Sequence, residues 1–378
     1  MKHVKTTMLL LGIWPVRRNG DFLEILYEIY FLTTFIYYII FNISGLALAI
    51  QTWSANYLTT ASSMGIVIEY VSNAYKVILI EEKEQRIFQS NNEAFIKIYK
   101  QNSASNRNVV LFYTLMGTIG ISLYFITPII SNVTMPLGFN NQTGIKNHYF
   151  IVFSWFPFDP NRYYTTAYLI QFFGCLIGYS YIVHCGAFYI SILSFIRAQL
   201  KILQQTVSHL PEYCITYKRQ FNLNEQHSQI VVLRALIQEH LDIIDFVTKL
   251  NDTIRSFSLM NFIISSFQLS LVAYQIFQLP VLQQITVFSY FITLSTQLFL
   301  TYNAAHQIII ESENIASSIF EGDWYDYSPE TSKFLQMICM RAQKPLAMTI
   351  GPISDMKITA LFQIFKALYS YICLIMKA

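Results

Sequence analysis

The chain has 378 residues, of which 54% are hydrophobic and only 12% carry a charge. Soluble globular domains carry about 25% charged residues, so this composition excludes an ordinary soluble protein and indicates an integral membrane protein. The net charge of +3 is small and the basic residues are scattered, which gives no basis for nucleic-acid binding.

Seven apolar stretches approach or exceed the ~20 residues that a helix needs to cross a bilayer. No alternating strand pattern recurs, so we predict an all-α membrane protein with seven transmembrane helices in contact with lipid. The fourth and sixth stretches exceed one bilayer thickness and should continue as helices beyond it. The stretches lie at about 29–50, 60–80, 109–131, 164–196, 257–279, 281–310 and 350–376.

The Lys and Arg residues predict a cytoplasmic N-terminus and an extracellular C-terminus. Four precede the first stretch, six lie between the second and third when Lys76 near the end of the second is counted with them, seven between the fourth and fifth, and three before the last. The opposite side holds three, which is a strong positive-inside signal. The N-terminal segment is similar to a signal peptide but lacks a small-residue cleavage site, so we expect it to be retained on the cytoplasmic side.

The segment 197–256 has apolar residues near helical spacing, which predicts long cytoplasmic helices that form an anchor layer beneath the membrane. We therefore divide the chain into three parts. Residues 1–310 form a six-span and anchor region, 311–349 a cytoplasmic packing helix, and 350–378 the seventh span.

The last span carries charges that are costly in lipid, so it should face protein or water. They are Asp355, Lys357 and Lys366. Alternatively the helix begins later, and Asp355 and Lys357 lie at the membrane interface with their charges extended toward water. Lys366 lies nine residues deeper than Lys357, so we predict that Lys366 faces a pore or a neighbouring subunit.

Aromatic residues cluster in the outer halves of several spans, as in pockets for small apolar ligands. Plain helix packing also uses aromatic residues, so the pattern alone leaves both interpretations open. Sequons at Asn132 and Asn141 fall in the longest outside loop, where we expect glycosylation. We find no phosphate loop, nucleophile elbow or metal-ligand spacing, and expect no catalytic, cofactor or metal site.

Three segments near the end of the chain, Ile315–Tyr325, Arg341–Leu346 and Phe365–Tyr371, closely resemble the C-terminal signature of insect odorant receptors. The opening Leu11–Pro15 and the stretch 240–257 are also similar to that family. The resemblance covers the whole chain. It implies an odorant-gated, non-selective cation channel, without enzymatic activity, in the plasma membrane of olfactory neurons.

The resemblance also implies a heterotetramer with the family's shared co-receptor, with the last span lining the pore and a helix at 329–343 packed in the central anchor. Leu374 falls where the co-receptor's tail has an apolar gate residue, and Lys377 where that tail has a neutral Gln. A ring of four lysines would repel cations. We therefore expect a ligand-tuning subunit that needs the co-receptor.

The resemblance places the ligand pocket, for a small apolar volatile molecule, in the outer halves of spans two to six. A seven-helix G-protein-coupled receptor has the opposite topology and is the main alternative; a gustatory receptor of the same superfamily is the nearer one. The residues that we expect to line the pocket are Ile66, Tyr70, Ser122, Phe125, Tyr168, Phe172, Cys175, Tyr274 and Phe291.

Overall fold

The computed structural model describes most of the chain from residue 80 onward. The first expected span lies partly outside the described residues, and the second lies almost wholly outside them. The described residues are helical positions between 26 and 40, then 80, 82–90, 92–135, 147–152, 154–222 and 224–377, with side chains described through Cys373.

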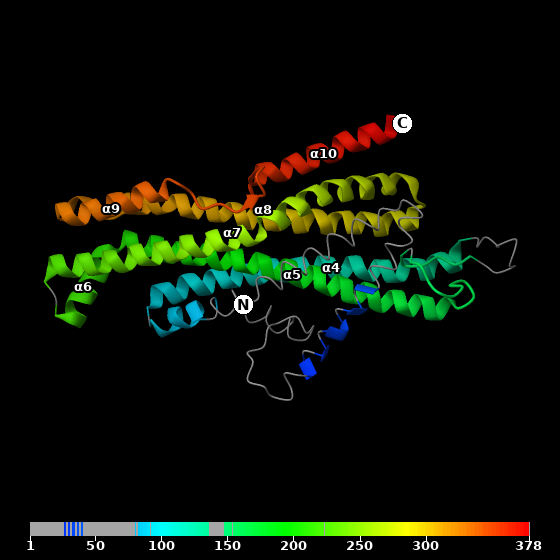
Figure 1. Cartoon of the computed structure of the whole chain (residues 1–378), viewed down its shortest axis with the longest axis horizontal. Helices are drawn as coiled ribbons and strands as arrows, with labels where there is room; N and C mark the ends of the chain where they lie inside the picture. Colours follow the sequence, from blue (N-terminus) through cyan, green and yellow to red (C-terminus); the bar gives the residue numbers. More distant parts are fainter. Residues whose placement is uncertain are drawn as a thin grey trace.

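Four long helices form the body of the molecule and lie nearly parallel to one another (Figure 1). They are α4 (Glu93–Thr134), α5 (Tyr164–Ser208), α7 (Glu225–Gln278) and α8 (Val281–Glu321), and each contains an apolar stretch long enough to cross a membrane. At ~1.5 Å per residue, α7 measures about 81 Å, whereas the hydrocarbon core of a bilayer is about 30 Å thick. These helices therefore continue well beyond a membrane.

Shorter elements complete the described fold. We call the end of the bundle where α6 and α9 lie the α6 end, and the opposite end, where residues 147–163 join α4 to α5, the loop end (Figure 1). The shorter elements are α6 (Leu210–Phe221), the 3-10 helix η1 (Trp324–Asp326), α9 (Pro329–Ala342), the antiparallel pair β1 (Thr349–Ile350) and β2 (Ser354–Asp355), and α10 (Ile358–Lys377).

Capping residues set the starts of two helices. The side chain of Asn92 accepts hydrogen bonds from two backbone N–H groups in the first turn of α4. Ser328 does the same for α9 through the N–H of Thr331, with Pro329 at the first helical position and Glu330 in the first turn. The fixed φ of proline and the negative charge of glutamate both favour a helix N-terminus.

Helix α5 lies at the centre of the bundle and packs against α4, α7 and α8. Most of its residues from Val183 to Leu203 are buried. Gly117 of α4 permits a close approach to α5, because a Cβ there would lie 2.9 Å from the ring of Tyr179. On the other side of α4, Leu111 and Leu115 are exposed one turn apart, as suits a face in contact with lipid.

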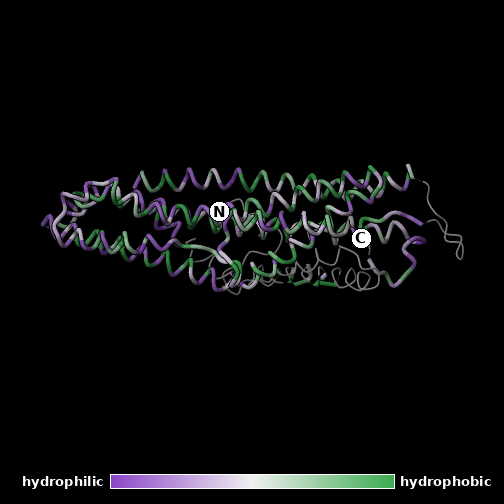
Figure 2. Tube along the Cα trace, turned by 90° about the horizontal axis from the view of Figure 1, so that it is seen from above, coloured by the Kyte–Doolittle hydropathy of each residue, from purple (hydrophilic) through white to green (hydrophobic). Residues whose placement is uncertain are grey.

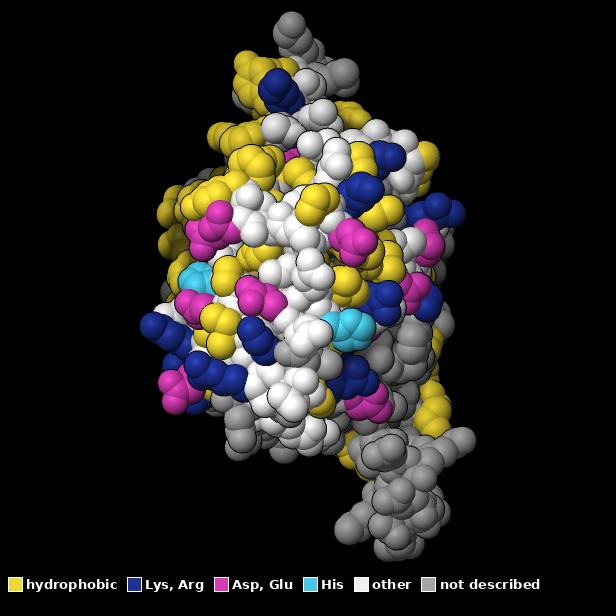
Figure 3. All heavy atoms as spheres, turned by 90° about the vertical axis from the view of Figure 1, so that its left-hand side faces the viewer, with side chains coloured by type: hydrophobic (Ala, Val, Ile, Leu, Met, Phe, Trp, Pro, Cys, Tyr) yellow, Lys and Arg dark blue, Asp and Glu magenta, His cyan; other side chains and the backbone are white. Residues whose placement is uncertain are grey.

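The α6 end is more polar than the middle of the bundle. Hydrophilic residues gather there in Figure 2, and Figure 3, which views this end, shows Lys and Arg, Asp and Glu, and His side chains spread over it. The parts of α5, α7 and α8 beyond their apolar stretches therefore present a surface suited to water.

The last span begins later than predicted. Helix α10 starts at Ile358, and residues 349–355 form a short β-hairpin instead of helix, because Gly351 adopts a φ of +54° and is followed by Pro352. Asp355 and Lys357 precede the helix and form an ion pair at 3.1 Å. These two charges therefore lie outside the final helix, which agrees with the alternative of a later start.

The segment 311–349 also differs from a single packing helix. Helix α8 continues through Glu321, η1 follows, and α9 then runs antiparallel to the end of α8, with Leu335 and Ile338 buried against the bundle. Gly322 ends α8, where it lies close to the carbonyl of Ser208 at the end of α5.

Candidate functional site

Three of the predicted pocket residues meet between α4 and α5. The rings of Phe125 and Phe172 lie with their centroids 4.4 Å apart. The hydroxyl of Tyr168 donates to the backbone carbonyl of Phe125 at 2.6 Å, which fixes the tyrosine ring beside them. Cys175, about two turns beyond Tyr168 on the same face of α5, contributes a small apolar side chain to the same region.

The other predicted pocket residues are distributed differently. Ser122 is exposed on α4, and its hydroxyl donates to the carbonyl of Thr118 in the same helix. Tyr274 and Phe291 are half-buried and belong to other helices than the cluster between α4 and α5, Tyr274 to α7 and Phe291 to α8. Ile66 and Tyr70 lie outside the described residues.

A second cluster, which was not predicted as a unit, joins α4, α7 and α8. Tyr124 contacts Tyr290 edge-on with ring centroids 5.9 Å apart, and the side chain of Gln268 donates to the Tyr290 hydroxyl at 2.6 Å. The hydroxyls of Thr127 and Thr286 bond to each other on the loop-end side. A buried glutamine within an apolar span was the available signal, because intramembrane polar residues usually have a partner or a function.

The side chain of Gln171 holds the connection between α4 and α5 in place at the loop end through hydrogen bonds to the backbone of that connection. This side chain is 1% exposed, accepts from the N–H of Ile151 at 3.0 Å and donates to the carbonyl of Val152 at 2.7 Å. The amide thus pairs with the backbone much as a neighbouring strand would. The loop is held in one place above the two aromatic clusters.

Asn132 fastens the same loop from α4. Its Oδ1 accepts from the N–H of Tyr149, and its Nδ2 donates to the carbonyl of Tyr149 at 3.0 Å and to the hydroxyl of Tyr164 at 2.9 Å. A glycan would replace one of these two hydrogens. The geometry therefore favours a structural role for Asn132 over the glycosylation expected from its sequon, while Asn141 lies outside the described residues.

Helix α10 has two distinct faces. Ala360, Leu361 and Ile364 are buried against the bundle. Residues three and four positions apart share a helix face, so the opposite side forms a continuous exposed stripe that combines polar and aromatic side chains. This stripe consists of Thr359, Phe362, Gln363, Lys366, Tyr369 and Ser370.

Lys366 lies on that exposed stripe. That it faces a pore or a neighbouring subunit stays a prediction. Leu374 and Lys377 belong to the last turns of α10, where side chains lie outside the description.

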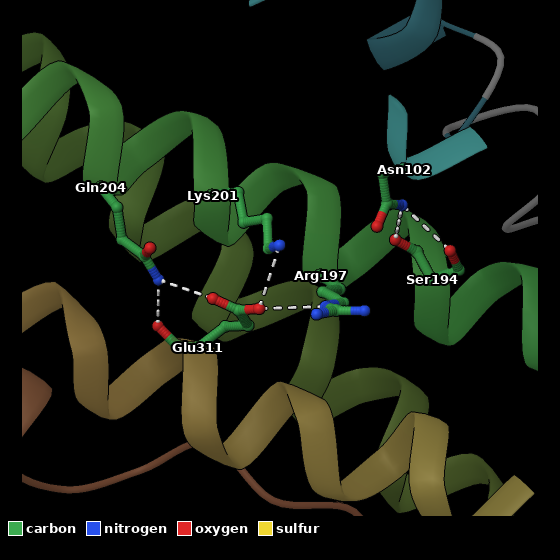
Figure 4. Close-up of polar contacts among 6 residues, drawn as sticks. All are labelled: Asn102, Ser194, Arg197, Lys201, Gln204 and Glu311. Atoms are coloured by element: carbon green, nitrogen blue, oxygen red, sulfur yellow. Dashed lines mark hydrogen bonds and ion pairs between the residues drawn. The ribbon is translucent and has the colours of Figure 1, made fainter. Parts of the chain in front are cut away.

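An ion-pair network joins α5 to α8 (Figure 4). The carboxylate of Glu311, only 7% exposed, contacts Arg197 Nε at 3.0 Å and Lys201 Nζ at 3.4 Å. Gln204 donates to the same carboxylate and, at 2.6 Å, to the backbone carbonyl of Glu311. Arg197 and Glu311 directly follow the apolar stretches 164–196 and 281–310, so the network marks a common level where both spans end.

The chain is similar in sequence to known odorant receptors. A family model described as 7tm Odorant receptor matches residues 75–369. Odorant receptor 10 of Aedes albopictus is 29% identical over 216 residues, which cover 56% of this chain and 55% of that receptor. The odorant receptor coreceptor of Aedes aegypti is 28% identical over 121 residues, covering 32% and 25%. The matches thus span about half, or less, of these relatives' lengths.

The fold is also similar to a solved structure. The olfactory receptor OR5 from Machilis hrabei, in complex with eugenol, superposes with a TM-score of 0.77 at 14% identity, covering 100% of this chain and 97% of that one. The same receptor in another structure gives a TM-score of 0.75. The all-α, seven-span fold class is therefore confirmed, and because the family model covers most of its length, the chain belongs to the seven-transmembrane odorant receptor family.

Proposed function

We propose that this chain is the ligand-tuning subunit of an odorant-gated, non-selective cation channel. The observation that carries the proposal is the exposed stripe of α10, which includes Gln363, Lys366 and Ser370 on a helix otherwise apolar enough for a membrane. Polar side chains on such a helix need water or a protein partner. Four such helices around an axis would supply a wet pore.

The pore composition argues for a heteromer. Four copies of Lys366 and of Lys377 would place rings of positive charge along a cation pathway, which opposes cation entry. Subunits of the shared co-receptor would dilute these charges, and Leu374 would contribute to an apolar gate near the tip. The similarity to the Aedes aegypti coreceptor supports a common assembly geometry.

The ligand site consists of the two clusters beneath the fastened loop. Phe125, Tyr168 and Phe172 supply an apolar surface, while Gln268 and Tyr290 supply hydrogen-bonding groups. Such a lining suits a small volatile molecule with an apolar body and one polar group. The named relative OR5 has been solved with eugenol, a molecule of this kind.

The proposal includes the orientation and location. The N-terminus and the α6 end face the cytoplasm, the loop end and the C-terminus face outward, and the assembly lies in the plasma membrane. The positive-inside distribution and the polar surface of the α6 end support this orientation. Epitope tags on the two termini of unpermeabilised cells test it: only the C-terminal tag should be stained.

Patch-clamp recording tests the channel itself. Cells that express this chain with the co-receptor, with G-protein signalling blocked, should give cation currents to members of a panel of volatile alcohols, esters and phenols. Cells that express this chain alone should give none. Loss of current under the G-protein block would favour the G-protein-coupled alternative.

Cysteine accessibility tests the pore assignment of α10. In Lys366→Cys, a water-soluble thiol reagent should alter the odour-evoked current, because this position lies on the exposed stripe. Ile364→Cys, two positions away on the buried face, is the matched control and should be insensitive, with the wild type recorded as the background for native cysteines. Equal sensitivity of both variants would contradict the assignment.

A further inference from the structure

The β-hairpin between α9 and α10 is a fixed connector. Thr349 pairs with Asp355 and Ile350 with Ser354, and the N–H of Met356 donates to the carbonyl of Met348 at 2.7 Å. The side chains of Met348, Ile350 and Met356 are all buried in the core. The joint between the two helices is therefore held by its own pairing and by packing, unlike a solvated linker.

Asn251 of α7 holds the first strand of this hairpin. Its Oδ1 accepts from the N–H of Thr349 at 2.8 Å and from the Thr349 hydroxyl at 3.1 Å. Asparagine is an unfavourable residue inside a helix, since its side chain competes for backbone hydrogen bonds. Here the side chain bonds across to another element, which gives a tertiary reason for its position in the middle of α7.

The same face of α7 holds the turn of the hairpin. One turn beyond Asn251, the carbonyl of Arg255 accepts from the N–H of Gly351 at 3.0 Å. One turn further, Leu259 lies so close that a Cβ on Gly351 would be 2.9 Å from its Cδ2. Positions 251, 255 and 259 follow one another at four-residue spacing, so one stripe of α7 contacts the first strand and the turn of the hairpin.

The hairpin leads directly into α10. Asp355 ends the second strand, and the carbonyl of Lys357 already accepts from the N–H groups of Ala360 and Leu361 in the first turn of the helix. We call the hydrogen bonds that the hairpin donates to Asn251 and to the carbonyl of Arg255 the clamp. There is no free length of chain between this clamp and α10. Any movement of the base of α10 away from α7 must therefore pull on the hairpin.

We propose that Asn251 is a positioning residue for gating: its two hydrogen bonds to Thr349 hold the base of α10 in the arrangement in which the inner face of α10 packs against α7 and α8. This inference rests on the proposed channel function. In a channel that opens by outward movement of α10, the clamp favours the closed state. Weakening the clamp shifts the equilibrium toward the open state.

The expected size of the shift in each variant follows from the free energy of ordinary hydrogen bonds. A net contribution of one such bond corresponds to about a fivefold change in an equilibrium constant. Asn251→Ala, which removes the acceptor of two bonds, should raise the odour-independent open fraction and lower the half-maximal odorant concentration by about five- to twentyfold. Thr349→Val, which keeps the backbone donor and removes the hydroxyl, should give a smaller shift of about two- to fivefold.

The experiment uses the full chain co-expressed with the co-receptor. The probe is the member of the alcohol, ester and phenol panel, eugenol included, that gives the largest wild-type current. Each variant is scored for surface protein, odour-independent current relative to cells with the co-receptor alone, and half-maximal concentration. Asn251→Asp, which retains an acceptor oxygen, should restore values near the wild type.

Asp252→Ala is the matched control, because Asp252 is the adjacent residue of α7 and is exposed. It should leave the half-maximal concentration and the odour-independent current unchanged.

The outcomes separate the two proposals. One outcome is that the wild-type chain gives a current while Asn251→Ala and Thr349→Val leave the half-maximal concentration and the odour-independent current unchanged. This result would overturn the gating role and leave the channel function standing. Reduced current in proportion to reduced surface protein, with no shift in half-maximal concentration, would overturn the gating role in favour of a purely structural one. Absence of any wild-type current across the panel would overturn the channel function and this inference with it.

Discussion

The ion-pair network between α5 and α8 predicts an asymmetric response to charge removal. The Glu311 carboxylate is 7% exposed, whereas the side chains of Arg197 and Lys201 are 31% and 36% exposed. If the carboxylate is removed, both cations can still be hydrated. If both cations are removed, a carboxylate remains buried with Gln204 as its remaining partner in the network.

The magnitudes follow from this difference in burial. The double variant Arg197→Met/Lys201→Met should lower the free energy of unfolding by about 3–5 kcal/mol, because it leaves a buried charge without a counter-ion. Glu311→Gln keeps an acceptor oxygen and should cost about 1–2 kcal/mol, the loss of its charge-assisted bonds. The triple variant with Glu311→Leu should return to within about 1 kcal/mol of the wild type, because no buried charge is left.

The order of stability of these variants can be tested by melting temperatures. They are measured on the purified complex with the co-receptor, in one detergent at pH 7. The double variant should melt lowest and the triple variant above it. The order should persist at high salt, since buried pairs are weakly screened. A Glu311→Gln variant that melts as low as the double variant would refute the reasoning.

Three further predictions concern single positions. Asn132→Gln should leave a glycosidase-sensitive gel shift unchanged, because both hydrogens of its amide are donated; a smaller shift would contradict this. Burial, assisted by Arg341, lowers the pKa of His240 to about 4 from the ordinary 6.5, so stability should fall as pH drops from 6.5 toward 4. In His240→Gln, melting temperatures over this range should fall less than in the wild type. Gly117→Ala should destabilise by about 1–3 kcal/mol. Gly120→Ala, whose new Cβ would meet its nearest neighbour at 3.2 Å rather than 2.9 Å, should cost less in the same melting assay.

Most of the fold could be predicted from the lengths of the apolar stretches. The apolar stretches expected at 109–131, 164–196, 257–279 and 281–310 lie within long helices to within one residue, because a chain segment away from water must satisfy its own backbone hydrogen bonds, as a helix does. The start of the last helix was misplaced by eight residues. The Gly351–Pro352 pair was the signal that could have corrected it, since such dipeptides mark turns.

The contacts within the candidate ligand site were harder to predict than the fold, for a geometric reason. Which side chains of neighbouring spans meet depends on how each helix is rotated about its axis, and a uniformly apolar stretch has no period that fixes this rotation. Phe125 and Phe172 were predicted individually from their residue type, but the link from Gln268 to Tyr290 requires the rotations of α7 and α8 together. The hairpin strands, at two residues each, are too short to leave a periodic pattern.

The unbroken length of α7 has a mechanical consequence. Gln268, in the second cluster, and Asn251, at the hairpin, lie on the same helix 17 residues apart, about 26 Å along its axis. No proline interrupts the helix between them. A tilt or axial shift of α7 produced at one of these points is transmitted to the other as rigid-body motion, with no relay of side chains needed in between.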